Sequence, residues 1–169
     1  MKEYFVMDAY NVIYAWPVLQ KEAEENLEEA RAKFIEMMRE YQSFKGVSII
    51  IVFDAHLSKK SIGLKEDVKG IEIIYTKYRE TADSYIEKRM ASLLKRAKVT
   101  VVTSDWAEQQ IVFGGGALRM SSRELVIDYD SIKNKIRSSA TKQIKRRETV
   151  ENRLTEEVIE KLKKMVQDK

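Results

Sequence analysis

The chain has 169 residues, a length typical of one folded domain. Hydrophobic residues make up 44% and charged residues 34%, which excludes wholesale disorder. The lack of cysteine excludes disulfides, thiolate metal ligands and a cysteine nucleophile. The N-terminus lacks the pattern of a signal peptide, and no apolar run approaches the roughly 20 residues that cross a bilayer. We therefore expect a cytoplasmic protein with no membrane partner.

The net charge of +4 is unevenly distributed. Between Lys133 and Arg153, eight basic residues stand against two acids, so this segment carries +6 and the remainder −2. A basic segment beside a more acidic body favours a partner with a phosphate backbone. A solvated helical face is the competing interpretation.

Strands and helices alternate from the N-terminus, which predicts an α/β fold with a mainly parallel sheet between layers of helices. Apolar, β-branched runs predict strands at residues 3–8, 47–53, 71–75 and 98–103, and a short strand at 117–120. Apolar residues at spacings of three and four predict a helix from Lys21 to Phe44 and another from Thr81 to Ala97. Asp105 begins a further helix that the glycines at 114–116 end.

The segment from His56 to Gly70 contains lysines and two glycines, and it is predicted to be a loop. A helix follows from residue 121 or 122 into the 130s. Residues 138–141 (Ser-Ser-Ala-Thr) form a weak hinge, and residues 155–167 a terminal amphipathic helix. This division predicts one α/β domain at residues 1–137 and a basic helical extension at 138–169.

Three predicted strands run directly into an aspartate, namely Asp8, Asp54 and Asp105. Ligands of open α/β sheets bind beyond the carboxyl ends of the strands, so these acids should converge. Asp83 lies in the first turn of its helix, which faces the same edge. Carboxylates held together repel one another unless a cation lies among them. The pattern therefore predicts a site for a divalent metal.

Each acid also has a purely structural interpretation. Asp8 could cap a short helix at residues 9–15, and Asp105 could cap the helix that it begins. Asp83 could complement a helix dipole. In the functional interpretation, the small residue after Asp8 lets the chain turn tightly and brings the Asn11 amide to the same site.

Ligation by oxygen alone selects hard cations, so Mg²⁺ or Mn²⁺ fits and zinc does not. An ion held by a few carboxylates accepts phosphate oxygens from a substrate. The corresponding chemistry is hydrolysis of a phosphodiester bond. No small-molecule cofactor is expected.

Several motifs together resemble one family of nucleases. They are Val6-Met7-Asp8-Ala9-Tyr10-Asn11-Val12-Ile13, Phe53-Asp54-Ala55-His56, Glu80-Thr81-Ala82-Asp83, Thr103-Ser104-Asp105 and Phe113-Gly114-Gly115-Gly116-Ala117-Leu118-Arg119. In this order they resemble the NYN-domain ribonucleases of the YacP group, which are relatives of PIN-domain nucleases. Within that group they look most like bacterial ribosome-associated endoribonucleases that cut messenger RNA in the ribosomal A site. The one departure is Ala9, where relatives commonly have glycine.

The resemblance implies a PIN-like fold and metal-dependent endonucleolytic cleavage of RNA, with messenger RNA and the ribosome as partners. It implies that Asp8, Asp83 and Asp105 are the catalytic metal ligands. Residues expected to support them are Asn11, Asp54, Glu80, Thr103 and Ser104. Residues expected to contact RNA are Arg119, Ser121, Arg123, Lys142, Lys145, Arg146 and Arg147.

Several other features have two interpretations. His56, the only histidine, is either a general base or a turn residue that bonds backbone. The glycines at 114–116 lack the ending of a P-loop, so a helix stop is expected. Tyr10, Trp16, Tyr78 and Trp106 either stack on bases or belong to the core.

Three other functions compete with the endoribonuclease. An RNA- or ribosome-binding module would use the acids only to cap helices. A phospho-acceptor receiver domain is disfavoured because the first strand ends in one acid instead of a pair. A haloacid-dehalogenase phosphatase is disfavoured because Tyr10 occupies the position of its second aspartate.

Overall fold

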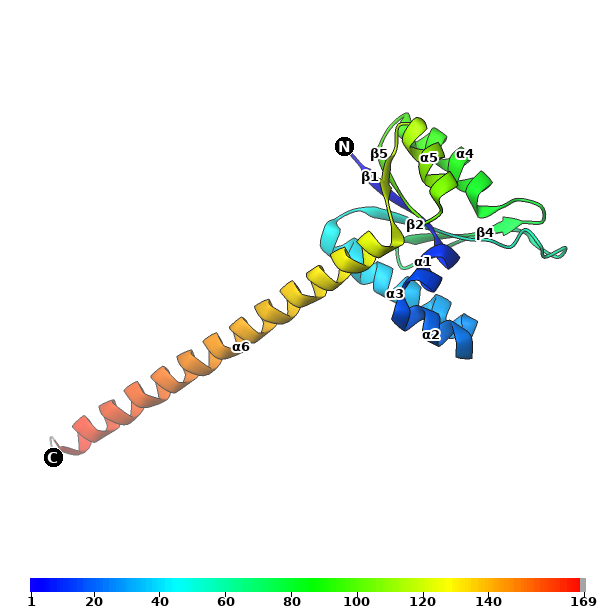
Figure 1. The fold of residues 1–169 in the computed structure, drawn as a ribbon. Coiled ribbons are helices and arrows are strands. Elements are labelled where there is room, and N and C mark those ends of the chain that lie inside the picture. Colours follow the sequence, from blue (N-terminus) through cyan, green and yellow to red (C-terminus); the bar gives the residue numbers. More distant parts are fainter. Residues whose placement is uncertain (168–169) are drawn as a thin grey trace. The chain divides into compact units, whose positions relative to one another are not determined.

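The computed structural model describes residues 1–167, and its centre is a six-stranded sheet (Figure 1). The strands are β1 (Glu3–Asp8), β2 (Ser48–Phe53), β3 (Ile62–Val68), β4 (Ile71–Lys77), β5 (Lys98–Val102) and β6 (Leu118–Met120). Their order in the sheet is β3-β4-β2-β1-β5-β6, and every pairing except β3 with β4 is parallel. This confirms the predicted α/β fold with a mainly parallel sheet.

The helices are α1 (Ala9–Ala15), α2 (Pro17–Glu25), α3 (Leu27–Lys45), α4 (Ala82–Leu94), α5 (Trp106–Gly114) and α6 (Ser122–Gln167). Among residues 1–129, helices cover both faces of the sheet (Figure 1). On one face, α4 and α5 pack against Val6, Ile50 and Val101. On the other face, α3 contacts the sheet, and the ring of Tyr41 lies 5.9 Å from that of Phe5. Alternate residues of each central strand therefore enter two separate cores.

The predicted helix from Lys21 to Phe44 is two helices. Asn26 separates α2 from α3, and its side chain accepts hydrogen bonds from the backbone N–H groups of Glu28 and Glu29 at 3.1 and 3.3 Å. An asparagine followed by acids in the first turn is a start signal for a helix. The apolar periodicity continues across this break, which is why periodicity alone missed it.

The predicted loop from His56 to Gly70 contains the edge strand β3. Its side chains are almost all exposed, so it shows no apolar alternation. It pairs antiparallel with β4 through a two-residue turn at Lys69 and Gly70, whose φ angles are +53° and +88°. A tight hairpin turn requires such positive values, and the charged residues of β3 are typical of a sheet edge.

The predicted hinge at residues 138–141 is wrong, because α6 continues through it as one helix of 46 residues. The hydroxyl of Thr141 donates to the carbonyl oxygen of Arg137 at 2.9 Å, one turn back in the same helix. Hydroxyl residues therefore remain compatible with the helix here. By its internal contacts the chain divides into two compact units, Met1–Tyr129 and Asp130–Lys169. Within residues 1–167, no helix combines the length and apolar character needed to cross a bilayer.

Candidate metal centre

Asp8 ends β1 and occupies the N-cap position of α1, yet its side chain makes no capping hydrogen bond. Its carboxylate is therefore available to a ligand. Burial, and next the negative charge of Asp83, raise the pKa of Asp8 to about 7. An acid with this pKa lies in surroundings that disfavour its charged form.

Asp83 lies in the first turn of α4, but the capping is done by Thr81, whose hydroxyl accepts from the Ser84 N–H at 3.2 Å. This leaves the carboxylate of Asp83 outside the capping interaction. Its pKa is raised by partial burial and by the charges of Asp105 and Asp54.

Glu108 completes the group from the first turn of α5. Its side chain is 4% exposed, and neither carboxylate oxygen accepts a hydrogen bond from a backbone N–H among residues 1–167. Burial, together with the charges of Asp8 and Asp83, outweighs the hydrogen-bonding effect of the Thr103 side chain and raises the pKa of Glu108 to about 8. A buried carboxylate without backbone donors, next to two further acids, is costly to keep charged, so it indicates a cation that stabilises it.

Asp8, Asp83 and Glu108 can each present one carboxylate oxygen within 4.8 Å of the other two. The oxygens come from the end of β1 and from the first turns of α4 and α5. Three carboxylates without a histidine or cysteine suit Mg²⁺ or Mn²⁺. The residues present therefore fit the metal that the sequence predicted.

Two other predicted acids accept hydrogen bonds from backbone N–H groups. Asp54 accepts from the N–H of Ala82 at 3.0 Å and from the N–H of His56 at 3.0 Å. Burial opposes ionisation of Asp54, but these N–H groups outweigh it and hold its pKa below the usual value. Asp105 caps α5 by accepting from the N–H groups of Ala107 and Glu108 at 2.9 and 3.3 Å.

Asp105 nevertheless lies close to the cluster, because its charge contributes to the raised pKa of both Asp8 and Asp83. His56 has a partner that the sequence did not reveal, since its Nδ1 is hydrogen-bonded to the carboxylate of Asp54. The turn that carries His56 is thus fixed to the end of β2.

Asn11, Thr103 and Ser104 form a brace around the metal centre. The Asn11 side-chain oxygen accepts from the Ser104 N–H at 2.6 Å and from the Ser122 hydroxyl at 3.0 Å. The Ser104 hydroxyl accepts from the Ser122 N–H at 3.1 Å, and the Thr103 hydroxyl accepts from the Asp105 N–H at 3.1 Å. These bonds join the starts of α1, α5 and α6 beside the cluster.

The remaining predicted residues are not members of the group of three carboxylates. Glu80 pairs with Lys88 at 3.5 Å, and the exposed Arg119 donates to Gln109 at 3.0 Å. Ser121 and Glu124 cap α6, and Arg123 is exposed. The basic side chains predicted to contact RNA in α6 are all exposed: Lys142, Lys145, Arg146 and Arg147.

The aromatic residues divide between core and surface. Trp16 is buried, with its ring 5.1 Å from that of Tyr129. Trp106, next to Asp105, is 70% exposed, and Tyr78 is at the surface. Gly114 is the last residue of α5 and Gly115 is its C-cap, as predicted for a helix stop.

Glu108 is the residue that sequence reasoning missed. A glutamate three positions after a capping residue normally reaches back to the N–H of that residue. Here the Thr103 hydroxyl already occupies the Asp105 N–H, so Glu108 is released toward Asp8 and Asp83. The signal was the threonine two positions before Asp105.

With this geometry established, comparison with known proteins gives consistent matches. The YacP-like NYN domain matches residues 5–167. The chain belongs to the YacP-like NYN domain family. It is 41% identical to YacP of Bacillus subtilis (strain 168) over 160 residues, which is 94% of each chain.

Solved structures agree with this family. The crystal structure of Rae1 (YacP) from Bacillus subtilis matches at 39% identity with a TM-score of 0.68, covering 96% of this chain and 94% of that one. A crystal structure of a mutant of the same Bacillus subtilis protein matches at 41% identity with a TM-score of 0.68, covering 82% of this chain and 80% of that one. The resemblance to YacP-type NYN domains is confirmed, and with it the NYN fold and its relation to PIN-like nucleases.

Proposed function

We propose that this NYN protein is a metal-dependent endoribonuclease whose ion is held by Asp8, Asp83 and Glu108. The observation that carries the proposal is the buried Glu108 carboxylate, which has no backbone hydrogen-bond donor within residues 1–167 and can place an oxygen within 4.8 Å of oxygens of Asp8 and Asp83. Helix capping alone does not account for it. Asp105 adds negative charge at the rim and fixes the start of α5.

Each part of the site has a role in phosphodiester hydrolysis. A bound Mg²⁺ or Mn²⁺ supplies Lewis acidity and offsets the charge that develops on the phosphate. Asp8, Asp83 and Glu108 bind the ion. Asn11 and Ser104 brace the loop after β5, so the first turn of α5 stays in place.

The proposed substrate is messenger RNA in the cytoplasm, cut in association with the ribosome. The basic residues of α6 support this, because eight of them between Lys133 and Arg153 stand against two acids. Such a segment attracts a phosphate backbone by releasing counterions. Messenger RNA and ribosomal RNA both present such a backbone.

The first test is cleavage of RNA with Mg²⁺ or Mn²⁺, both as naked RNA and engaged in translation. We expect Asp8→Asn and Asp83→Asn each to reduce cleavage by at least about a hundredfold. The matched control is Glu87→Gln, an exposed acid one turn along α4 from Asp83, which should cleave like the parent. If the cluster variants cleave as well as the control, the protein is a binding module with helix-capping acids.

A second test concerns the basic segment. Replacing Lys142, Lys145, Arg146 and Arg147 with alanine should weaken binding to RNA or ribosomes and flatten its salt dependence. Metal binding should not change. An unaltered salt slope would mean that the segment is only a solvated surface.

A further inference from the structure

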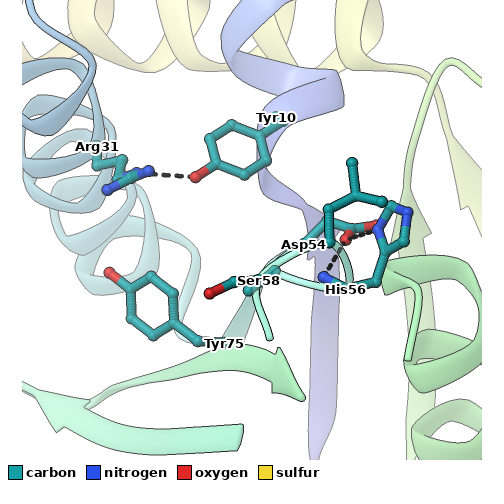
Figure 2. A pocket seen from close by; sticks show the side chains of 8 residues that line it. Tyr10, Arg31, Asp54, His56, Ser58 and Tyr75 are labelled. Atoms are coloured by element: carbon teal, nitrogen blue, oxygen red, sulfur yellow. Dashed lines mark hydrogen bonds and ion pairs between the residues drawn. The ribbon is translucent and has the colours of Figure 1, made fainter. Parts of the chain in front are cut away.

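A pocket of about 480 Å³ lies beside the metal centre, at the carboxyl ends of β2 and β4 (Figure 2). Its lining includes Tyr10, Arg31, His56, Ser58 and Tyr75. Asp54 borders it and contributes to the raised pKa of Asp8, so the pocket lies within electrostatic reach of the cluster. Its volume is within the range of about 300–1,000 Å³ that binds small molecules.

Arg31 provides the positive charge in this pocket. Its Nε donates to the Tyr10 hydroxyl at 2.9 Å, and the guanidinium carbon lies 5.5 Å from the centre of the Tyr10 ring. No carboxylate of residues 1–167 forms an ion pair with Arg31, although the side chain is partly buried. A fixed guanidinium without a protein counter-ion is suited to bind a phosphate.

Two tyrosine rings line the same pocket, and Phe53 contacts both. Tyr75 stacks on Phe53 with ring centres 5.1 Å apart and planes at 15°, while Tyr10 meets Phe53 edge-on at 5.4 Å and 69°. Figure 2 shows Tyr75 below Arg31, on the opposite side of the view from Asp54 and His56. Preformed aromatic surfaces of this kind stack on bases whatever their sequence.

We propose that this pocket binds one nucleotide of the RNA strand next to the cleaved bond, with its phosphate on Arg31 and its base against Tyr75. This rests on the proposed ribonuclease function and names a subsite for it. Adjacent strands lie about 4.8 Å apart, so the ends of β2 and β4 are about 5–10 Å from the end of β1. One RNA strand can therefore occupy the pocket and the metal centre together.

Glu28 and Glu66 act electrostatically on Tyr75 of the pocket, but no ion pair within residues 1–167 joins either of them to Arg31. Asp54 is bound by His56 and by the Ala82 N–H, and it lies across the pocket from Arg31 in Figure 2. Ser58, in the turn after β2, adds a hydroxyl to the lining. A hydroxyl donor beside a cation and two rings completes a set suited to a nucleotide.

The test measures binding without cleavage. The full-length protein is titrated into fluorescein-labelled single-stranded RNA of mixed sequence, in EDTA, at several salt concentrations, and anisotropy gives the dissociation constant. Arg31→Gln should weaken binding about tenfold and reduce the slope against log salt by about 0.7, as expected for one lost phosphate contact. Arg31→Lys should keep the slope and lose part of the affinity.

The aromatic contribution has a different signature. Tyr75→Leu should weaken binding by about tenfold without changing the salt slope, whereas Tyr75→Phe keeps the ring and should bind like the parent. The matched control is Arg39→Gln, an exposed arginine of α3 paired with Glu36. If Arg31→Gln, Arg31→Lys and Tyr75→Leu all bind RNA as tightly as Arg39→Gln, the subsite is wrong.

The two proposals fail separately. The subsite is tested by RNA binding in EDTA, where no metal is bound. The nuclease is tested by cleavage in the Asp8→Asn and Asp83→Asn variants, whose Arg31 and Tyr75 are intact. If RNA binding depends on Arg31 and Tyr75 but Asp8→Asn still cleaves RNA, the subsite proposal stands and the proposed metal centre is wrong.

Discussion

The first turns of α5 and α6 have the same pattern, a capping residue followed three positions later by a glutamate. The two glutamates nevertheless make different interactions. In α6, the Ser121 N–H donates to Glu124 at 2.6 Å and the Glu124 N–H donates to the Ser121 hydroxyl at 3.1 Å, a complete capping box. In α5, Asp105 caps the helix, but Glu108 does not return the bond, because the Thr103 hydroxyl holds the Asp105 N–H. One glutamate stabilises a helix, and the other faces two aspartates.

The pKa values express the same contrast. Hydrogen bonds from the backbone and side chain of Ser121 lower the pKa of Glu124. Burial and neighbouring negative charges raise the pKa of Glu108 to about 8. The comparison teaches that a carboxylate saturated by backbone N–H groups serves the fold, while one left unsatisfied in the interior is available to a metal.

The largest expected difference is in activity. Glu108→Gln removes a proposed metal ligand while keeping nearly the same shape, so RNA cleavage should fall at least about a hundredfold. Glu124→Gln keeps an acceptor for the Ser121 N–H and should cleave within about threefold of the parent. Single-turnover rates with Mn²⁺ measure both. Equal cleavage rates for the two variants would mean that Glu108 has no greater role in catalysis than Glu124.

The next largest effect is on the pH dependence of stability. The pKa of Glu108 is about 8 in the folded protein and about 4.5 in the unfolded chain. As pH rises between these values, the unfolded chain loses the Glu108 proton before the folded protein does. The stability of the metal-free protein should therefore fall across this pH range. At pH 9, Glu108→Gln should exceed the parent in free energy of unfolding by on the order of a few kcal/mol. The gap should shrink toward pH 5.

Urea denaturation in EDTA measures this difference, and Mn²⁺ provides the control. Added Mn²⁺ should stabilise the parent at pH 8 and have much less effect on Glu108→Gln. Glu124, with its lowered pKa, should act in the opposite sense, since its contribution is present at neutral pH and lost as the solution becomes acidic. A constant gap between parent and Glu108→Gln from pH 5 to 9 would contradict the raised pKa.

A smaller effect is expected from converting α5 into the α6 arrangement. Thr103→Val removes the hydroxyl that accepts from the Asp105 N–H and interacts with the Glu108 side chain, which allows Glu108 to turn back and cap the helix. Affinity for Mn²⁺ should fall about tenfold, as for other positioning residues of metal sites. Thr103→Ser keeps a hydroxyl and should restore binding. Calorimetric titration measures the Mn²⁺ affinity of both variants. If Thr103→Ser binds Mn²⁺ as weakly as Thr103→Val, the loss of affinity results from altered packing and not from the missing hydroxyl.

The smallest effect is expected from Asp105→Asn. Asparagine caps helices as well as aspartate does, so stability should change by only a few tenths of a kcal/mol. The loss of one nearby negative charge should reduce Mn²⁺ affinity by no more than about fivefold. A loss as large as that of Glu108→Gln would make Asp105 a direct ligand, as the family resemblance implies.

Much of the fold was accessible from the sequence, because buried parallel strands are continuous apolar runs. β1, β2 and β5 each end at or near an aspartate, and their shared edge follows from the alternation of strands and helices. The edge strand β3 was not accessible, since its exposed residues carry no apolar pattern. The break at Asn26 was hidden by periodicity that continues through it.

The metal centre was only partly accessible, for a reason of hydrogen bonding. Asp8 and Asp83 were placed at the right edge of the sheet, and they do approach each other. Which acids remain unsatisfied depends on which N–H groups they meet, and that is decided by tertiary contacts. Asp54 is occupied by the start of α4, 28 residues away along the chain, whereas Glu108 is released by a threonine.

Direct titration of metal-free protein with Mn²⁺, followed by calorimetry and by electron paramagnetic resonance, tests the central claim most closely. The account predicts that the parent and Glu124→Gln bind the ion alike, while Glu108→Gln binds it at least about tenfold more weakly. Equal Mn²⁺ affinity in the parent and in Glu108→Gln would contradict the assignment of this carboxylate to the metal centre.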